Sequence, residues 1–94
     1  MKFPIVICAE YTIFLEYFED VFWFHVNVRK WTPSVKNMML DDLKKLRDLV
    51  RMPLRALVDS ENLKLQKFGQ HLGWVVELET VLYDGSKAFV YKWS

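Results

Sequence analysis

The sequence predicts a mixed α/β (α+β) fold, in which helices pack on a mixed β-sheet. Runs of β-branched and aromatic residues alternate with two segments of helical periodicity. Only three glycines and three prolines occur in 94 residues, so element boundaries are readily placed. The expected order is β-β-α-β-α-β-β within one domain, residues 1–94, and residues 3–8 offer one further strand.

The first two strands form a predicted hairpin. Tyr11–Phe18 and Val21–Arg29 are rich in β-branched and aromatic residues, and Glu19-Asp20 separates them. The second strand is largely apolar on both faces, which is typical of a strand near the middle of a sheet.

An amphipathic helix follows. Thr32 is a good N-cap and Pro33 suits the first helical position. Pro53 should stop the helix at about Arg51. The expected buried stripe consists of Val35, Met39, Leu43, Leu46 and Val50.

The C-terminal half repeats the alternation. Leu54–Val58 reads as a short buried strand, and Asp59 or Ser60 should cap a second helix that ends at Gly73. The expected buried residues of that helix are Leu65, Phe68 and Leu72.

A second hairpin is predicted at the end of the chain. Trp74–Tyr83 and Ser86–Trp93 flank Asp84-Gly85, a strong signal for a two-residue turn. That turn sets a register. It pairs Val76 with Trp93, Leu78 with Tyr91, Thr80 with Phe89, and Glu77 with Lys92.

Composition favours a soluble protein of a reducing compartment. Seven Phe, four Tyr and four Trp supply a large core. The single cysteine, Cys8, cannot form an internal disulfide, and we expect it to pack. No segment approaches the roughly 18 apolar residues of a membrane span. We therefore expect a cytoplasmic protein without membrane contact.

The net charge of +1 is unevenly distributed. Residues 29–67 carry ten basic and five acidic residues, a net charge of +5. Such a segment could face the phosphates of a nucleotide or nucleic acid, or could be the solvated face of a helix. Asp41, Asp42 and Asp48 share the helix with these bases, so nucleic-acid binding is the weakest hypothesis.

Candidate chemistry is sparse. The two histidines have no Cys or His neighbour at metal-ligand spacing, so no metal site is predicted. His25 lies in a strand beside Trp23 and Asn27, where it is either a packed histidine or a catalytic one. His71, near the end of a helix, suits the helix dipole.

The turn between the second strand and the first helix is the most informative place. Helix N-termini attract phosphate, Arg29 and Lys30 add positive charge, and Thr32 and Ser34 add hydroxyl groups. Against this, Pro33 lacks an N–H and no glycine lets a phosphate approach the backbone. An ordinary capped helix start is the alternative.

Over residues 21–93 this order of elements resembles the GNAT superfamily of N-acetyltransferases. The family's pyrophosphate loop has the pattern Gln/Arg-x-x-Gly-x-Gly/Ala. Here the stretch reads Arg29-Lys30-Trp31-Thr32-Pro33-Ser34, so Thr32 and Ser34 replace the glycines. The family's second signature begins with an Asn, matched by Asn62, and ends in Gly-aromatic, matched by Gly73-Trp74. The family's general-acid Tyr falls on Gly69.

The resemblance implies specific roles. Backbone groups of Val26 and Val28 would hold the pantetheine of acetyl-CoA. Arg29, Lys30, Thr32 and Ser34 would hold its pyrophosphate, Asn62 would contribute to the cofactor site, and His25 is the candidate base.

The departures and the missing N-terminal helices make the chain most similar to small GNAT-like proteins of tailed bacteriophages. The first hypothesis is therefore a protein that requires no cofactor, has lost acetyl transfer and binds a protein partner, such as a host factor or virion component, in the host cytoplasm. The alternative is an acetyl-CoA-dependent N-acyltransferase. The sequence is compatible with a homodimer.

Overall fold

The computed structural model describes residues 2–93 and contains six strands and two helices. The strands belong to one mixed sheet, and the predicted α+β class is confirmed. In chain order the elements are β1 (Lys2–Ile7), β2 (Tyr11–Phe18), β3 (Val21–Val28), α1 (Pro33–Val50), β4 (Leu54–Asp59), α2 (Leu63–His71), β5 (Val75–Val81) and β6 (Lys87–Trp93). The further strand expected at residues 3–8 is present as β1.

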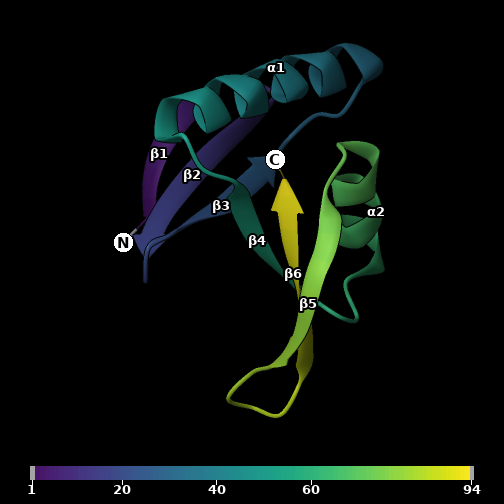
Figure 1. Ribbon diagram of the computed structural model, residues 1–94. Coiled ribbons are helices and arrows are strands. Elements are labelled where there is room, and N and C mark those ends of the chain that lie inside the picture. The colour runs from purple at the N-terminus through teal and green to yellow at the C-terminus, as the bar shows by residue number, and fades with distance from the viewer. Residues whose placement is uncertain (1, 94) are drawn as a thin grey trace. The chain divides into compact units, whose positions relative to one another are not determined.

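By contacts between residues, the chain divides into two compact units, one up to Leu54 and one over Arg55–Trp93. The expectation of a single domain stays a prediction. In the first unit β1, β2 and β3 are antiparallel neighbours. The helix α1 lies along one face of these strands (Figure 1).

The β2–β3 hairpin has the predicted two-residue turn. Phe18 pairs directly with Val21, so Glu19 and Asp20 form the loop. Both have positive φ, 50° and 63°. That geometry fits a type I′ turn, which matches the twist of a hairpin but usually contains Asn or Gly.

The core of the first unit forms between β2, β3 and the buried stripe of α1. Thr32 caps α1 as predicted, and Arg51 closes it in a left-handed conformation. Val50 is only half-buried, so the expected stripe is one residue too long. The buried side chains are Tyr11, Ile13, Leu15, Phe24, Val35, Met39, Leu43, Leu46 and Leu54.

In the second unit β6 lies between β4 and β5, and α2 joins β4 to β5. The indole Nε1–H of Trp93 donates to the carbonyl of Leu72 at 2.8 Å and so ties β6 to the end of α2. The buried side chains are Val58, Leu72, Trp74, Ala88, Val90, Tyr91 and Trp93.

The predicted start of α2 is wrong. Asn62, not Asp59 or Ser60, is the N-cap: its side chain accepts the N–H of Leu65 at 3.1 Å. The Asp59 carboxylate instead accepts the N–H of Glu61 and forms the turn before the helix. Of the three apolar residues expected in the core here, only Leu72 is buried; Leu65 and Phe68 are half-exposed.

The register predicted for the β5–β6 hairpin is also wrong. Its loop has three residues, because the N–H of Leu82 donates to the carbonyl of Ser86. Gly85 completes the turn at φ +85°, as in a hairpin that ends with a left-handed glycine. A β-bulge between Val76 and Leu78 shifts the pairing again. The observed pairs are Val75–Lys92, Val76–Tyr91, Leu78–Val90, Glu79–Phe89, Thr80–Ala88 and Val81–Lys87.

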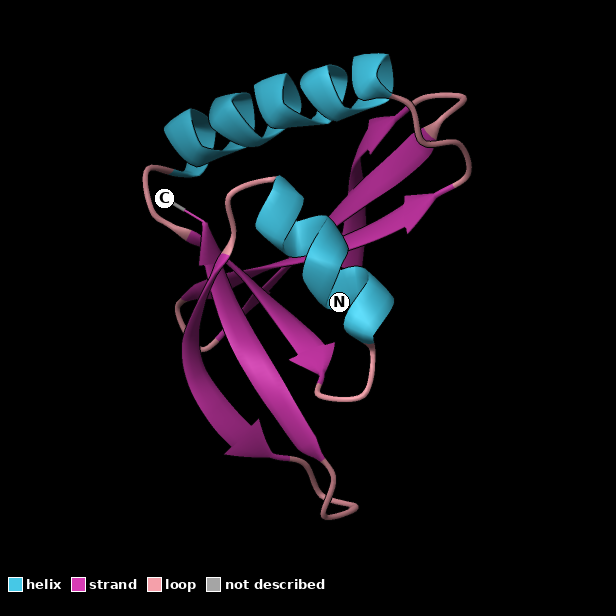
Figure 2. Cartoon of the chain, turned by 90° about the vertical axis from the view of Figure 1, so that its right-hand side faces the viewer, coloured by secondary structure: helices cyan, strands magenta, loops and turns pink. Residues whose placement is uncertain are grey.

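The hairpin is long. Within its unit, the distal part of β5–β6 extends beyond β4 and α2, as both views show (Figures 1 and 2).

Gly85→Val should destabilise the protein by about 1–2 kcal/mol, because a β-branched residue is strained at positive φ. No heavy atom lies within 4 Å of the added Cβ, so the loss would come from the backbone alone. Gly85→Asn, which tolerates this conformation, should lose less. Urea denaturation measures both, and equal stability of Gly85→Val and the parent would contradict this turn.

Glu19→Asn should stabilise the protein by roughly 0.5–1 kcal/mol, because Asn accepts positive φ more readily than Glu. Thermal unfolding is a suitable measurement, with Glu61→Asn as a matched change at another exposed loop position. A lower melting temperature for Glu19→Asn alone would show that the β2–β3 turn is not of this type.

Candidate functional site

The turn that joins β3 to α1, residues 29–32, is bound to the loop between β1 and β2. The backbone N–H groups of Arg29 and Lys30 both donate to the carbonyl of Glu10, at 2.8 and 3.1 Å. Two donors that a phosphate could have used are therefore bonded within the protein.

The Arg29 side chain is turned toward the same loop. Its Nε–H donates to the carbonyl of Ala9 at 3.1 Å, and Nη2 donates to the carbonyl of Cys8. Arg29 thus holds the β1–β2 loop against the start of α1. To bind a pyrophosphate, this guanidinium would have to leave two backbone acceptors.

The first turn of α1 uses most of its remaining donors. Thr32 Oγ1 accepts the N–H of Val35 at 3.1 Å, and the carbonyl of Thr32 accepts the N–H of Lys36 at 2.9 Å. Pro33 has no N–H. Among the described residues, the N–H of Ser34 has no partner and is the donor left in this helical turn.

The other predicted cofactor residues lie in two places. Val26 and Val28 are in β3, where they pair with Ile13 and Tyr11 of β2, next to the Arg29–Ser34 turn. Asn62 belongs to the second unit and caps α2. Its side chain already has a structural role that accounts for it.

His25 has a partner that the sequence analysis missed. Its Nε2 lies 3.0 Å from Oε1 of Glu16 on β2, and both side chains are about one-third exposed. The hydrogen bond from His25, together with the positive charge of Lys2, holds the pKa of Glu16 below its usual value. The predicted two-residue turn at Glu19-Asp20 already implies that Glu16 lies diagonally across from His25.

A second pair, Tyr11 and Asp42, was also missed. The buried Tyr11 hydroxyl donates to Asp42 Oδ2 and connects β2 to α1. Burial, and then the Asp42 carboxylate, raise the pKa of Tyr11 well above its usual value, so it stays protonated. Asp42 lies three residues after Met39 and four before Leu46, a spacing that places it beside the buried stripe.

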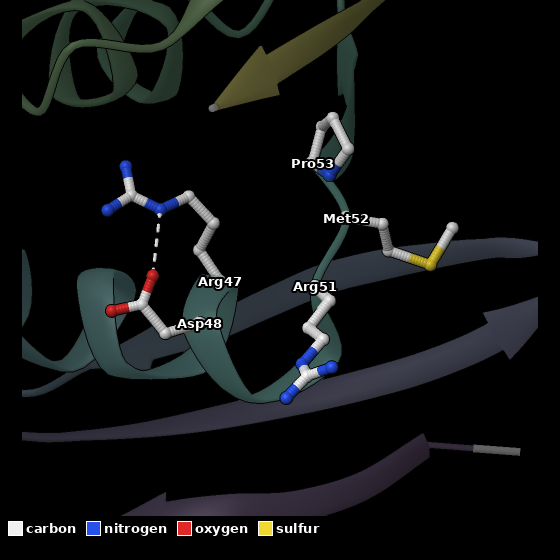
Figure 3. A pocket seen from close by; sticks show the side chains of 5 residues that line it. All are labelled: Arg47, Asp48, Arg51, Met52 and Pro53. Atoms are coloured by element: carbon white, nitrogen blue, oxygen red, sulfur yellow. Dashed lines mark hydrogen bonds and ion pairs between the residues drawn. The ribbon is translucent and has the colours of Figure 1, made fainter.

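An open pocket of about 380 Å³ lies at the other end of α1. Its lining residues are Arg47, Asp48, Arg51, Met52 and Pro53. Figure 3 shows that the side chains of Arg47 and Arg51 point in different directions, and that Arg47 is bonded to Asp48 at 3.5 Å. The two guanidinium groups therefore do not converge on one ligand position.

Residues 2–93 contain no group of three or more His, Cys, Asp or Glu side chains that could hold a metal ion. Within the same residues, neither helix is long and apolar enough to cross a membrane.

Comparison with known proteins shows the fold. No family model matches the chain, and no curated protein matches its sequence. Among solved structures, it is similar to a GNAT-family acetyltransferase from Bordetella pertussis, with a TM-score of 0.69 and 13% identity over 90% of this chain and 57% of that one.

Two further matches are forms of spermidine N-acetyltransferase from Vibrio cholerae. A point mutant has a TM-score of 0.69 and 12% identity over 89% of this chain and 56% of its own. A chimera has 0.64 and 13% over 88% and 57%. The chain thus has the GNAT fold and spans a little over half the length of these structures.

Glu16→Gln should lower the stability at pH 7, because the ionised Glu16 has a lowered pKa in the folded state. This contribution is present above the pKa of Glu16 in the unfolded chain and disappears as the pH falls through the lowered folded-state value. The difference between parent and variant should shrink as the pH falls below the unfolded-state pKa of about 4.3 and vanish below the lowered folded-state value. Denaturant unfolding from pH 3 to 7 tests it, and a pH-independent difference would contradict the pairing.

Proposed function

We propose that this chain is a GNAT-like protein that has lost acetyl transfer and acts by binding a protein partner. The observation that carries the proposal is the bonding of the β3–α1 turn to the β1–β2 loop. Three of the four residues that the resemblance assigns to the pyrophosphate, Arg29, Lys30 and Thr32, are engaged with the chain's own backbone.

A pyrophosphate needs several N–H donors that point toward one place. At three of the six positions of the Arg29–Ser34 turn none is offered: the N–H groups of Arg29 and Lys30 go to Glu10, and Pro33 has none. With Thr32 and Ser34 in place of glycines, side chains also occupy the approach to the backbone. The residues present therefore do not fit acetyl-CoA as the fold family binds it.

Exposed apolar side chains support the partner-binding half of the proposal. On β1, Phe3, Ile5 and Ile7 are all exposed, and on β5 so are Val75, Val76, Leu78 and Val81. Exposed apolar side chains gathered on one strand of a small protein commonly mark an interaction site. The resemblance to phage proteins suggests a host factor or a virion component as the partner.

The second candidate is an acetyl-CoA-dependent N-acyltransferase. The fold of the acetyltransferases that resemble it and the bond between His25 and Glu16 favour this alternative. In the neutral tautomer of His25 that donates its Nε2–H to Glu16, Nδ1 is unprotonated and could accept a proton. A cofactor site would still have to form elsewhere than in the turn as it stands.

Calorimetric titration with acetyl-CoA and with CoA separates the two candidates. We expect no heat of binding at millimolar cofactor, because the turn offers too few free N–H donors that point toward one place. Lys30→Glu is the informative control, since it reverses one charge while the Arg29 side-chain bonds remain.

Micromolar binding that Lys30→Glu weakens would overturn the proposal in favour of the transferase. The double variant Arg29→Glu, Lys30→Glu should then bind still less. Its fold must be checked by circular dichroism, because it also removes the bonds to Cys8 and Ala9.

A further inference from the structure

We infer that the outer edge of β5 is the partner-binding surface, and that it accepts an extended strand whose side chains alternate between basic and apolar. This inference rests on the proposed function and names the chemistry of the partner. It is carried by three properties of β5: its exposure, its unpaired edge and its charge.

The residues of β5 are unusually exposed for a strand. Six of the seven residues of β5 are exposed, and the apolar ones among them point to both faces of the sheet. Val81 is 65% exposed, and Tyr83, just beyond the strand, is fully exposed. An added strand would cover apolar side chains on both sides at once.

The edge itself is open. β5 is the last strand in the sheet order, and within the described residues no strand pairs with its outer side. Edge N–H and C=O groups of this kind are what a peptide uses when it adds a strand to a sheet. The bulge between Val76 and Leu78 distorts the first part of β5, so the regular edge runs from Leu78 to Val81.

The charge on β5 is of one sign. Its two charged residues are Glu77 and Glu79, which would lie close to basic side chains of an added strand. Glu77 is engaged with Arg55 at 3.2 Å, and both side chains are largely covered. Among the ion pairs of the described residues, Glu79 forms one with the exposed Lys87, at 3.6 Å, an interaction of little strength that a partner can replace.

The same charges disfavour a second copy of this chain. A two-fold antiparallel pairing of β5 with itself has one residue opposite its own copy. When that residue is Leu78, Glu77 faces Glu79 twice; when it is either glutamate, that glutamate faces itself. Like charges directly opposite are destabilising. Glu77 and Glu79 therefore disfavour the self-pairings centred on residues 77–79 and favour a basic strand.

The tip of the hairpin is preorganised to extend the contact. Asp84 Oδ1 accepts the N–H of Ser86 at 2.9 Å and also its hydroxyl, which holds the pKa of Asp84 below its usual value. The loop therefore presents Tyr83 at little entropic cost. Exposed tyrosines of this kind are frequent anchors of protein interfaces.

Nuclear magnetic resonance with a synthetic probe tests the inference. The probe is an acetylated and amidated pentapeptide of alternating lysine and valine; the control peptide has glutamate in place of lysine. Saturating basic peptide should slow hydrogen exchange of amides in the Leu78–Val81 segment about ten-fold. Glu79→Lys should weaken its binding at least about five-fold, and Glu79→Gln less, whereas Glu61→Lys should have no effect.

Several outcomes would overturn it: no exchange protection of β5 at millimolar peptide, equal binding of the acidic peptide, or full affinity in Glu79→Lys with its spectrum otherwise unchanged. A dimer in sedimentation whose Leu78–Val81 amides are protected from exchange would assign the edge to a second copy instead. Because the cofactor titration is separate, failure here leaves the loss of acetyl transfer untouched.

Discussion

The first unit depends on the hydrogen bonds between the β3–α1 turn and three successive carbonyl groups of the β1–β2 loop. Cys8, Ala9 and Glu10 accept four hydrogen bonds from the backbone and guanidinium of Arg29 and from the N–H of Lys30. These bonds hold the chain before α1 against the β1–β2 loop, and the Tyr11–Asp42 bond connects the middle of α1 to β2. A helix start held in this way has little freedom to rearrange around a ligand.

Local signals predicted most of the fold. Periodicity placed α1 and the β2–β3 hairpin, and the side chains of Thr32 and Pro33 placed the helix start, because each feature depends on residues close in sequence. The predictions were wrong where more than one residue could cap the helix or more than one turn length could close the hairpin. Asp59, Ser60 and Asn62 can all cap a helix, and a turn around Gly85 can hold two or three loop residues.

The candidate site, like the fold, was predicted in part. The absence of glycines from residues 29–34 could be read directly, and it indicated a poor phosphate site. The hydrogen bonds of the Arg29 side chain could not be predicted from the sequence, because their acceptors are backbone carbonyls, which every residue possesses. Glu16 and Tyr11 were within reach of prediction, since the register of the hairpin and the spacing along α1 bring them to their partners.

Under the proposed function, these observations link the stability of the fold to the loss of acetyl transfer. In a phosphate-binding turn, glycines leave N–H groups open, and the charge of a bound anion satisfies them. In this chain the carbonyl of Glu10 accepts the N–H groups of Arg29 and Lys30, and the Arg29 side chain forms two further bonds. Substituting glycine at positions 32 and 34 alone would not free the N–H groups of Arg29 and Lys30, because the carbonyl of Glu10 would still accept them. Under the proposed function, this turn serves as a structural connection, and recognition of the partner falls to surfaces such as β5.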